Sequence, residues 1–172
     1  MYNKTKCGFT LAELMAVVII VALLAALGTG YYRRSVEQSR FSEGLMTASA
    51  IVEGINRDYL EQRMNGVADP SIPRLNQLDI GISGTVEHQT ACESNVCHTQ
   101  YFDIRAHSDG MITAGRVDGI YQGAYDIQIQ PHFAQADRDQ ISCKGNTADG
   151  LTFCQAMGYT SCASDDTCTK PN

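Results

Sequence analysis

The chain has 172 residues, with 13 Lys and Arg against 19 Asp and Glu, so its formal net charge is −6 at neutral pH. That length accommodates one membrane helix and one modest domain. The acidic balance disfavours binding to nucleic acid, because the phosphates would be repelled, and we expect no specific nucleic-acid partner. The sequence contains no glycine-rich phosphate loop, H-E-x-x-H or G-x-S-x-G string, so we expect neither an enzyme nor a bound cofactor.

Residues 1–8 are polar and positive, and an apolar segment follows them from Phe9 to Gly30. Between Phe9 and Leu27 the segment has eleven Leu, Ile, Val or Phe residues and no proline, which predicts a membrane-spanning helix. Lys4 and Lys6 would hold the N-terminal end in the cytoplasm. We therefore expect a single-pass precursor in the inner membrane with its C-terminus outside the cytoplasm.

Glu13 is the one charged residue of this apolar segment. A carboxylate inside a membrane helix costs roughly 2.5 to 3.5 kcal/mol, which the eleven apolar residues offset with roughly 3 to 6 kcal/mol. Such an acid usually has a partner, yet the segment contains no Lys, Arg or His. Cleavage after Gly8 would give Phe9 a free α-amino group about one helical turn from Glu13.

The string from Gly8 to Glu13, GFTLAE, resembles the processing site of type IV pilins and of type II secretion pseudopilins. The resemblance implies that prepilin peptidase cuts after Gly8 and that Phe9 becomes the N-methylated first residue. Glu13 would then neutralise the N-terminus of a neighbouring subunit. Further copies of the chain, the inner-membrane assembly machinery and the bilayer before assembly are the implied partners, and an extracellular pilus is the implied final location.

The apolar segment has two alternative interpretations. A secretory signal peptide also has a basic start, an apolar run and small residues near its cut, here Ala25, Ala26 and Gly28. A plain single-pass anchor accounts for the hydrophobicity, but it accounts for neither the GFTLAE string nor Glu13.

The helix is expected to continue beyond the membrane, as a transmembrane and assembly part over residues 9–30 and an amphipathic part over residues 31–64. Gly28 and Gly30 each weaken it by about 1 kcal/mol relative to Ala. Many type IV pilins have a proline near this place and this chain has none, so loosening of the helix in a filament stays an open question. The apolar face of the second part comprises Phe41, Leu45, Ala48, Val52, Ile55 and Tyr59.

Four residues follow the apolar segment directly. Tyr31 and Tyr32 fit an aromatic belt at the membrane interface. Arg33 and Arg34 favour pairing with lipid headgroups or with another subunit, and a solvated flank is the alternative.

Asn65 and Gly66 then end the helix, and Pro70 and Pro73 prevent its prompt resumption.

The remainder, residues 65–172, is expected to form one globular headpiece. Residues 65–99 form a connecting loop with a short strand at residues 84–88. Residues 100–143 form an antiparallel sheet, with strands over residues 100–106, 111–117, 124–130 and 140–143. Residues 144–172 form a disulfide-bounded tail that includes a helix over residues 148–157. The fold class is α+β, with the long N-terminal helix packed on the sheet.

The chain has seven cysteines, and removal of residues 1–8 would take Cys7 and leave six. Outside the cytoplasm these six are expected to form disulfides, for which fifteen pairings exist. Short-range pairing is the first choice: Cys92 with Cys97, Cys143 with Cys154, and Cys162 with Cys168. A metal site at Cys92, Cys97 and His98 is the alternative, although the spacing fits no common zinc pattern, and we expect no metal.

The remaining polar residues carry weaker signals. His88, His98, His107 and His132 are scattered through polar stretches and are expected at the surface. Asp165 and Asp166 resemble the calcium-binding region of major pseudopilins, and a solvated acidic turn is the alternative.

Three functions therefore remain in consideration. The first is a structural pilin that polymerises through its N-terminal helix into a type IV pilus, for adhesion, motility or DNA uptake. The second is the major pseudopilin of a type II secretion system. A membrane-anchored binding or redox module that uses the cysteines is the alternative from another class.

Overall fold

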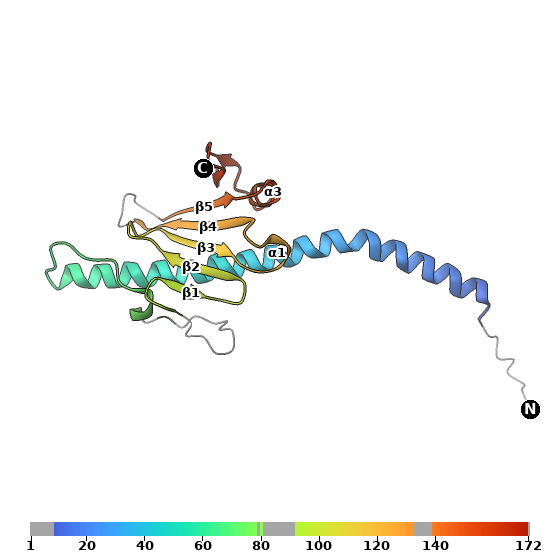
Figure 1. Ribbon diagram of the computed structural model, residues 1–172, viewed down its shortest axis with the longest axis horizontal. Helices are drawn as coiled ribbons and strands as arrows, with labels where there is room; N and C mark the ends of the chain where they lie inside the picture. Colours follow the sequence, from blue (N-terminus) through green and yellow to red (C-terminus); the bar gives the residue numbers. More distant parts are fainter. Residues whose placement is uncertain (1–8, 79, 81–91, 133–138, 172) are drawn as a thin grey trace, which may run out of the picture. The chain divides into compact units, whose positions relative to one another are not determined.

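The computed structural model describes residues 9–78, 80, 92–132 and 139–171, and it contains one long helix, a seven-stranded sheet and a short second helix (Figure 1). In chain order the elements are α1 (Leu11–Met64), η1 (Leu75–Gln77), β1 (Val96–His98), β2 (Phe102–Ala106), β3 (Ile112–Arg116), η2 (Gly119–Tyr121), β4 (Tyr125–Gln130), β5 (Gln140–Gly145), α3 (Ala148–Ala156), β6 (Ser161–Cys162) and β7 (Thr167–Thr169). The predicted α+β class is confirmed.

Helix α1 is hydrogen-bonded without interruption through Gly28 and Gly30, and it ends where the sequence predicts. Gly66 has a φ of 82°, its amide donates to the Arg63 carbonyl, and the Val67 amide donates to the Gln62 carbonyl. This is the Schellman motif, in which a left-handed glycine satisfies the last carbonyls of a helix. The glycine thus terminates the helix because its lack of a Cβ makes that conformation inexpensive.

The chain divides into two compact units, residues 1–39 and residues 40–172. The first is the N-terminal part of α1. The second contains the remainder of α1 together with the strands β1 to β7. Its hydrophobic core lies between this part of the helix and the sheet. The helix contributes Phe41, Ala48, Ile51, Val52 and Ile55 to this core, which includes four positions of the predicted apolar face. Leu45 and Tyr59, the other two predicted positions, are half-buried.

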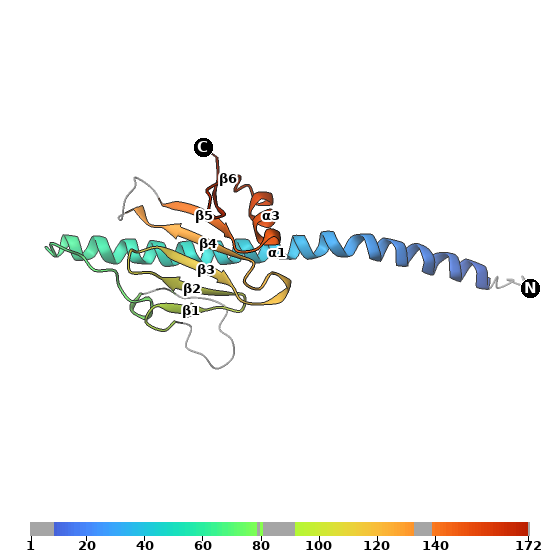
Figure 2. The same cartoon turned by 45° about the horizontal axis from the view of Figure 1, so that its top comes forward.

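All strand pairs of the sheet are antiparallel, and the strand order is β1-β2-β3-β4-β5-β7-β6. Figure 2 shows β1 to β5 side by side along the C-terminal half of α1. Buried and less buried side chains alternate along β2 and β4, and the buried ones are Phe102, Ile104, Tyr125, Ile127 and Ile129. The opposite face of the same strands is polar, so one face of the sheet and one face of the helix share a single core.

The sheet is larger than the sequence predicts. Strands β1, β6 and β7 lie in stretches that were expected to be irregular, and η1 occupies part of the connecting loop. These strands have two or three residues each, too few to show an alternating pattern. The strand expected at residues 84–88 lies outside the described residues.

Three disulfides join Cys92 to Cys97, Cys143 to Cys154, and Cys162 to Cys168. These are the short-range pairs that were the first choice from the sequence. Cys92 and Cys97 form an isolated β-bridge beside the β1 edge, and Cys162 and Cys168 are directly paired residues of β6 and β7. The disulfide between Cys143 and Cys154 attaches α3 to β5 in the core. Disulfides therefore cross-link both edges of the sheet, and one disulfide joins helix α3 to it.

Replacing both Cys143 and Cys154 by Ala is expected to lower the free energy of unfolding by about 3 kcal/mol, because the loop between them becomes free in the unfolded chain. Both residues are fully buried, so lost packing adds to the effect. The matched control replaces Cys162 and Cys168, which enclose a shorter loop and include an exposed cysteine. Thermal unfolding of the detergent-solubilised chain should rank the first pair as more destabilising, and the reverse order would contradict this expectation.

Candidate processing and assembly site

The start of α1 is built by a reciprocal pair of side chains, Thr10 and Glu13. The Glu13 Oε2 atom accepts hydrogen bonds from the Thr10 backbone nitrogen and from the Thr10 hydroxyl, both at 2.8 Å. In return, the Thr10 Oγ1 atom accepts from the Glu13 backbone nitrogen at 3.3 Å. This arrangement is a capping box, which satisfies amide groups that the helix itself leaves without partners.

Thr10 was not among the predicted site residues, although the sequence carries a signal for it. A Thr followed three residues later by Glu, ahead of an apolar run, is the pattern of a capping box. Glu13 therefore has a structural partner in the uncut chain, before any other subunit is present. These hydrogen bonds also offset part of the desolvation that the carboxylate would suffer in a membrane.

The proposed counter-ion for Glu13 does not exist in the uncut chain. The nitrogen of Phe9 is then part of a peptide bond with Gly8, and Gly8 itself lies outside the described residues. Phe9 is described and its side chain is exposed, as are those of Thr10 and Glu13. The pairing of the Phe9 amine with Glu13 thus depends on cleavage after Gly8 and remains a prediction.

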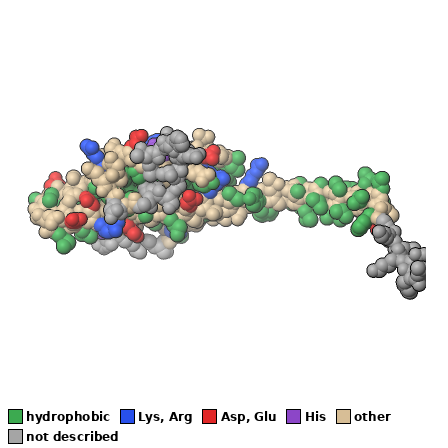
Figure 3. Space-filling view, turned by 90° about the horizontal axis from the view of Figure 1, so that it is seen from below, with side chains coloured by type: hydrophobic (Ala, Val, Ile, Leu, Met, Phe, Trp, Pro, Cys, Tyr) green, Lys and Arg blue, Asp and Glu red, His purple; other side chains and the backbone are tan. Residues whose placement is uncertain are grey.

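Apolar side chains are exposed along the N-terminal part of α1 on the face that Figure 3 shows, and none of its residues up to Ser35 is buried. By length and composition this part of the described chain is a helix able to cross a membrane. Exposed aliphatic side chains over so many turns are unfavourable in water, at about 25 cal/mol for each Å² of apolar surface. The helix requires either lipid or other apolar helices around it.

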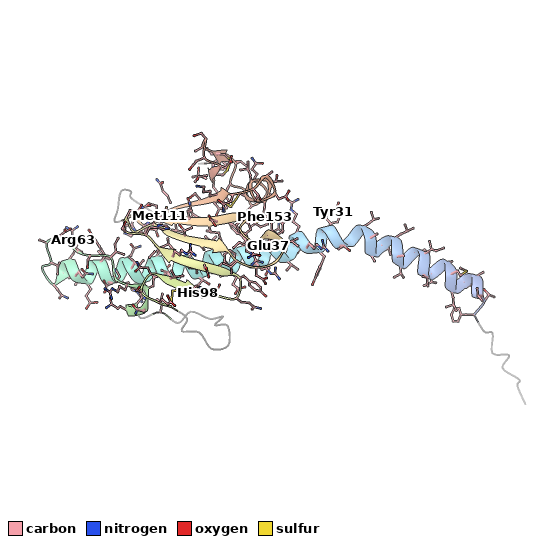
Figure 4. All side chains as sticks on the ribbon, in the orientation of Figure 1. Tyr31, Glu37, Arg63, His98, Met111 and Phe153 are labelled. Atoms are coloured by element: carbon pink, nitrogen blue, oxygen red, sulfur yellow. A yellow bond between two sulfur atoms is a disulfide. The ribbon has the colours of Figure 1, made fainter. Side chains whose placement is uncertain are left out.

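Four exposed residues follow this apolar part of the helix, and Figure 4 labels the first of them, Tyr31. Tyr32, Arg33 and Arg34 are exposed as well. Two aromatic rings followed by two guanidinium groups are the residue types that settle at the headgroup level of a bilayer. Their contacts with lipid or with another subunit stay predictions.

Residues 3–29 match the family model described as the prokaryotic N-terminal methylation motif. This is the prepilin-type motif of type IV pilins and pseudopilins, and it covers residues 3–8, the Thr10–Glu13 capping box and the apolar part of α1. No solved structure matches the chain. The motif and the long apolar helix fit a membrane-anchored precursor with a pilin-like or pseudopilin-like role.

The described histidines each contact a polar side chain. The Nδ1 atom of His98 lies 2.6 Å from a carboxylate oxygen of Asp103, the residue opposite it on β2. His107 contacts the Thr113 hydroxyl at 3.0 Å. His132 contacts Asp139 and Asn56. His88 lies outside the described residues, and the other three come from different places in the fold, so they do not form one cluster.

Asp165 and Asp166 lie in the turn between β6 and β7. The side chain and backbone amide of Thr167 donate hydrogen bonds to Asp165, and they hold the pKa of its carboxyl below the usual value. Asp166 has a φ of 60°, the left-handed conformation that Asp tolerates in tight turns. Among the described residues no group of three His, Cys, Asp or Glu is arranged to hold a metal ion. The two acids thus have a clear role in shaping this turn.

Proposed function

We propose that this protein is a structural subunit that polymerises through its N-terminal helix into a type IV pilus. The observation that supports the proposal most strongly is the exposed apolar helix that lies within a prepilin-type motif and begins with the Thr10–Glu13 capping box. In the membrane, lipid would cover this helix. In a filament, the same helices of other copies would replace the lipid.

Assembly requires one chemical change at the start of the helix. Prepilin peptidase would cut after Gly8, and the new Phe9 amine would carry a positive charge beside Glu13 of an adjacent copy. In the low-dielectric interior of a helix bundle, such a pair is much stronger than in water. Removal of residues 1–8 also removes Lys4 and Lys6, so the mature chain keeps 11 Lys and Arg against 19 Asp and Glu. The unit formed by residues 40–172 would then lie outside the cytoplasm with an acidic surface.

Processing is tested by intact-mass and N-terminal analysis of the protein from membranes. We expect a mature chain that begins at a methylated Phe9. A chain that still begins at Met1 would contradict the proposal, and so would one trimmed near Gly28 and released as a soluble protein. Electron microscopy of the same cells then separates a surface pilus, with long extracellular fibres, from the pseudopilin of a secretion system.

A further inference from the structure

Five large apolar side chains are exposed among the described residues of the unit formed by residues 40–172, and they are unevenly distributed. Leu60, Met64 and Val67 gather at the C-terminal end of α1. Met46 lies farther back on the helix. Ile120 lies on η2, in the connection between β3 and β4, and is 69% exposed. Leu60 and Met64 line one cavity, and exposed apolar side chains that lie together often mark a site of interaction between proteins.

Ile120 is presented on a well-supported turn. Asp118 caps η2 by accepting a hydrogen bond from the Gly119 amide at 2.7 Å. The ring of Tyr121 packs against that of Phe153, with their centroids 5.4 Å apart. The Gln122 amide closes the turn on the Gly119 carbonyl. Ile120 is thus an apolar projection with an exposed acid, Asp118, two residues before it.

A cavity of about 400 Å³ opens at the other end of the same unit, where Leu60 and Met64 lie. It is lined by Asn56, Tyr59, Leu60, Arg63, Met64 and His132. Asp139 holds His132 in place by accepting a hydrogen bond from its backbone amide at 2.8 Å and by contacting its ring at 3.1 Å. The cavity therefore combines the apolar side chains of Leu60 and Met64 with polar side chains, among which Arg63 carries a permanent positive charge.

The projection and the cavity cannot meet within one copy. Strand β4 separates them, because η2 comes just before its first residue and His132 comes just after its last, and six extended residues span about 20 Å. Figure 4 shows the same separation, with Arg63 at one end of the sheet and Phe153, which contacts the η2 turn, at the other. Two different patches at opposite ends of a subunit permit a head-to-tail contact that repeats without closing.

We propose that Ile120 of one copy occupies the cavity beside Arg63 of the next copy, and that Asp118 faces Arg63 across this contact. The inference rests on the proposed filament and names one of its subunit contacts. Apolar surface meets apolar surface, and an acid meets a base, so the two patches of this chain complement each other in both respects. The contacting copies would be offset by at least the roughly 20 Å that β4 spans.

Cysteine cross-linking in filaments tests the contact directly. A chain carrying both Ile120→Cys and Leu60→Cys is expected to form a ladder of covalent oligomers after mild oxidation, as seen on a non-reducing gel of sheared fibres. Each single variant should stay monomeric on that gel. The matched control combines Met46→Cys, at a side chain that is 75% exposed, with Leu60→Cys, and it should form no ladder. Assembled fibres without a ladder from the first pair would overturn the contact.

A second pair of variants needs no new cysteine. Ile120→Gln should reduce the yield of sheared fibres at least fivefold at unchanged protein level, whereas Met46→Gln should leave the yield near wild type. Equal yields from the two variants would overturn the inferred contact while leaving the filament proposal intact. Absence of fibres from wild-type cells would instead contradict the filament itself, so the two failures are distinguishable.

Discussion

Glu13→Gln is expected to reduce filament yield by more than about tenfold without preventing insertion into the membrane. Removing one partner of a buried ion pair costs about 3 to 5 kcal/mol, because the other charge is left uncompensated. Here the remaining charge would be the amine of the processed Phe9. Insertion should improve slightly, since an amide costs less to place in the bilayer than a carboxylate does. The measurement is immunoblotting of sheared fibres against the membrane fraction.

The capping box supplies the control for this experiment. Gln also serves at the third helical position of a capping box, so Glu13→Gln removes the charge and can keep the contact with Thr10. Thr10→Ala does the opposite, because it keeps the charge and removes the cap at a cost of about 1 kcal/mol. We expect a near-normal fibre yield from Thr10→Ala. If both variants lost fibres equally, the cap rather than the charge would be the essential feature of Glu13.

Gly150→Ala is expected to destabilise the unit formed by residues 40–172 by about 3 kcal/mol or more. A Cβ atom at this position would lie 1.8 Å from the carbonyl oxygen of Ala124. That oxygen accepts hydrogen bonds from the amides of Asn146 and Thr147, so it cannot move aside without breaking them. Overpacking against mobile side chains costs roughly 1 to 3 kcal/mol, and here the obstacle is backbone.

Gly150 lies on helix α3, which the added Cβ atom would displace. The displaced helix would also lose its aromatic contact with the sheet, where the rings of Phe153 and Tyr125 are stacked with centroids 4.8 Å apart. Thermal unfolding of the solubilised full chain should show a melting temperature lower by more than about 10 °C. Gln155→Ala is the control, at an exposed position of the same helix where Ala is a good helix former. A Gly150→Ala protein that melts with the control would show that α3 can shift freely.

Local patterns were sufficient for the membrane part of the chain. The apolar run, the basic residues before it and the GFTLAE string all lie within 30 residues, and each can be recognised without knowing what packs on it. The amphipathic face of α1 and its termination at Gly66 could be predicted for the same reason. Helical periodicity, and the termination of a helix by a left-handed glycine, each depend on a few neighbouring residues. Strands β2 to β5 also have enough residues to show alternation.

Local sequence patterns did not predict which charged side chains are buried. Arg116 ends β3 and is 2% exposed, a position that a strand pattern assigns to an apolar residue. It is accommodated because its guanidinium donates to the Tyr101 carbonyl at 2.9 Å and lies near the rings of Tyr101 and Phe102. Glu37 is likewise buried. Only the folded chain supplies the partners that offset the desolvation of a charge.

The sequence by itself determined the long helix, its apolar part and the central strands, because short-range periodicity and composition encode these. The GFTLAE string carried the resemblance to the prepilin-type motif. Tertiary structure decided the rest. It placed the three short strands at the edges of the sheet, made Gly150 a necessary glycine, and put Ile120 and the cavity beside Arg63 at opposite ends of one unit. Each of these depends on residues distant in the chain coming together, and no local pattern records which distant residue will be the neighbour.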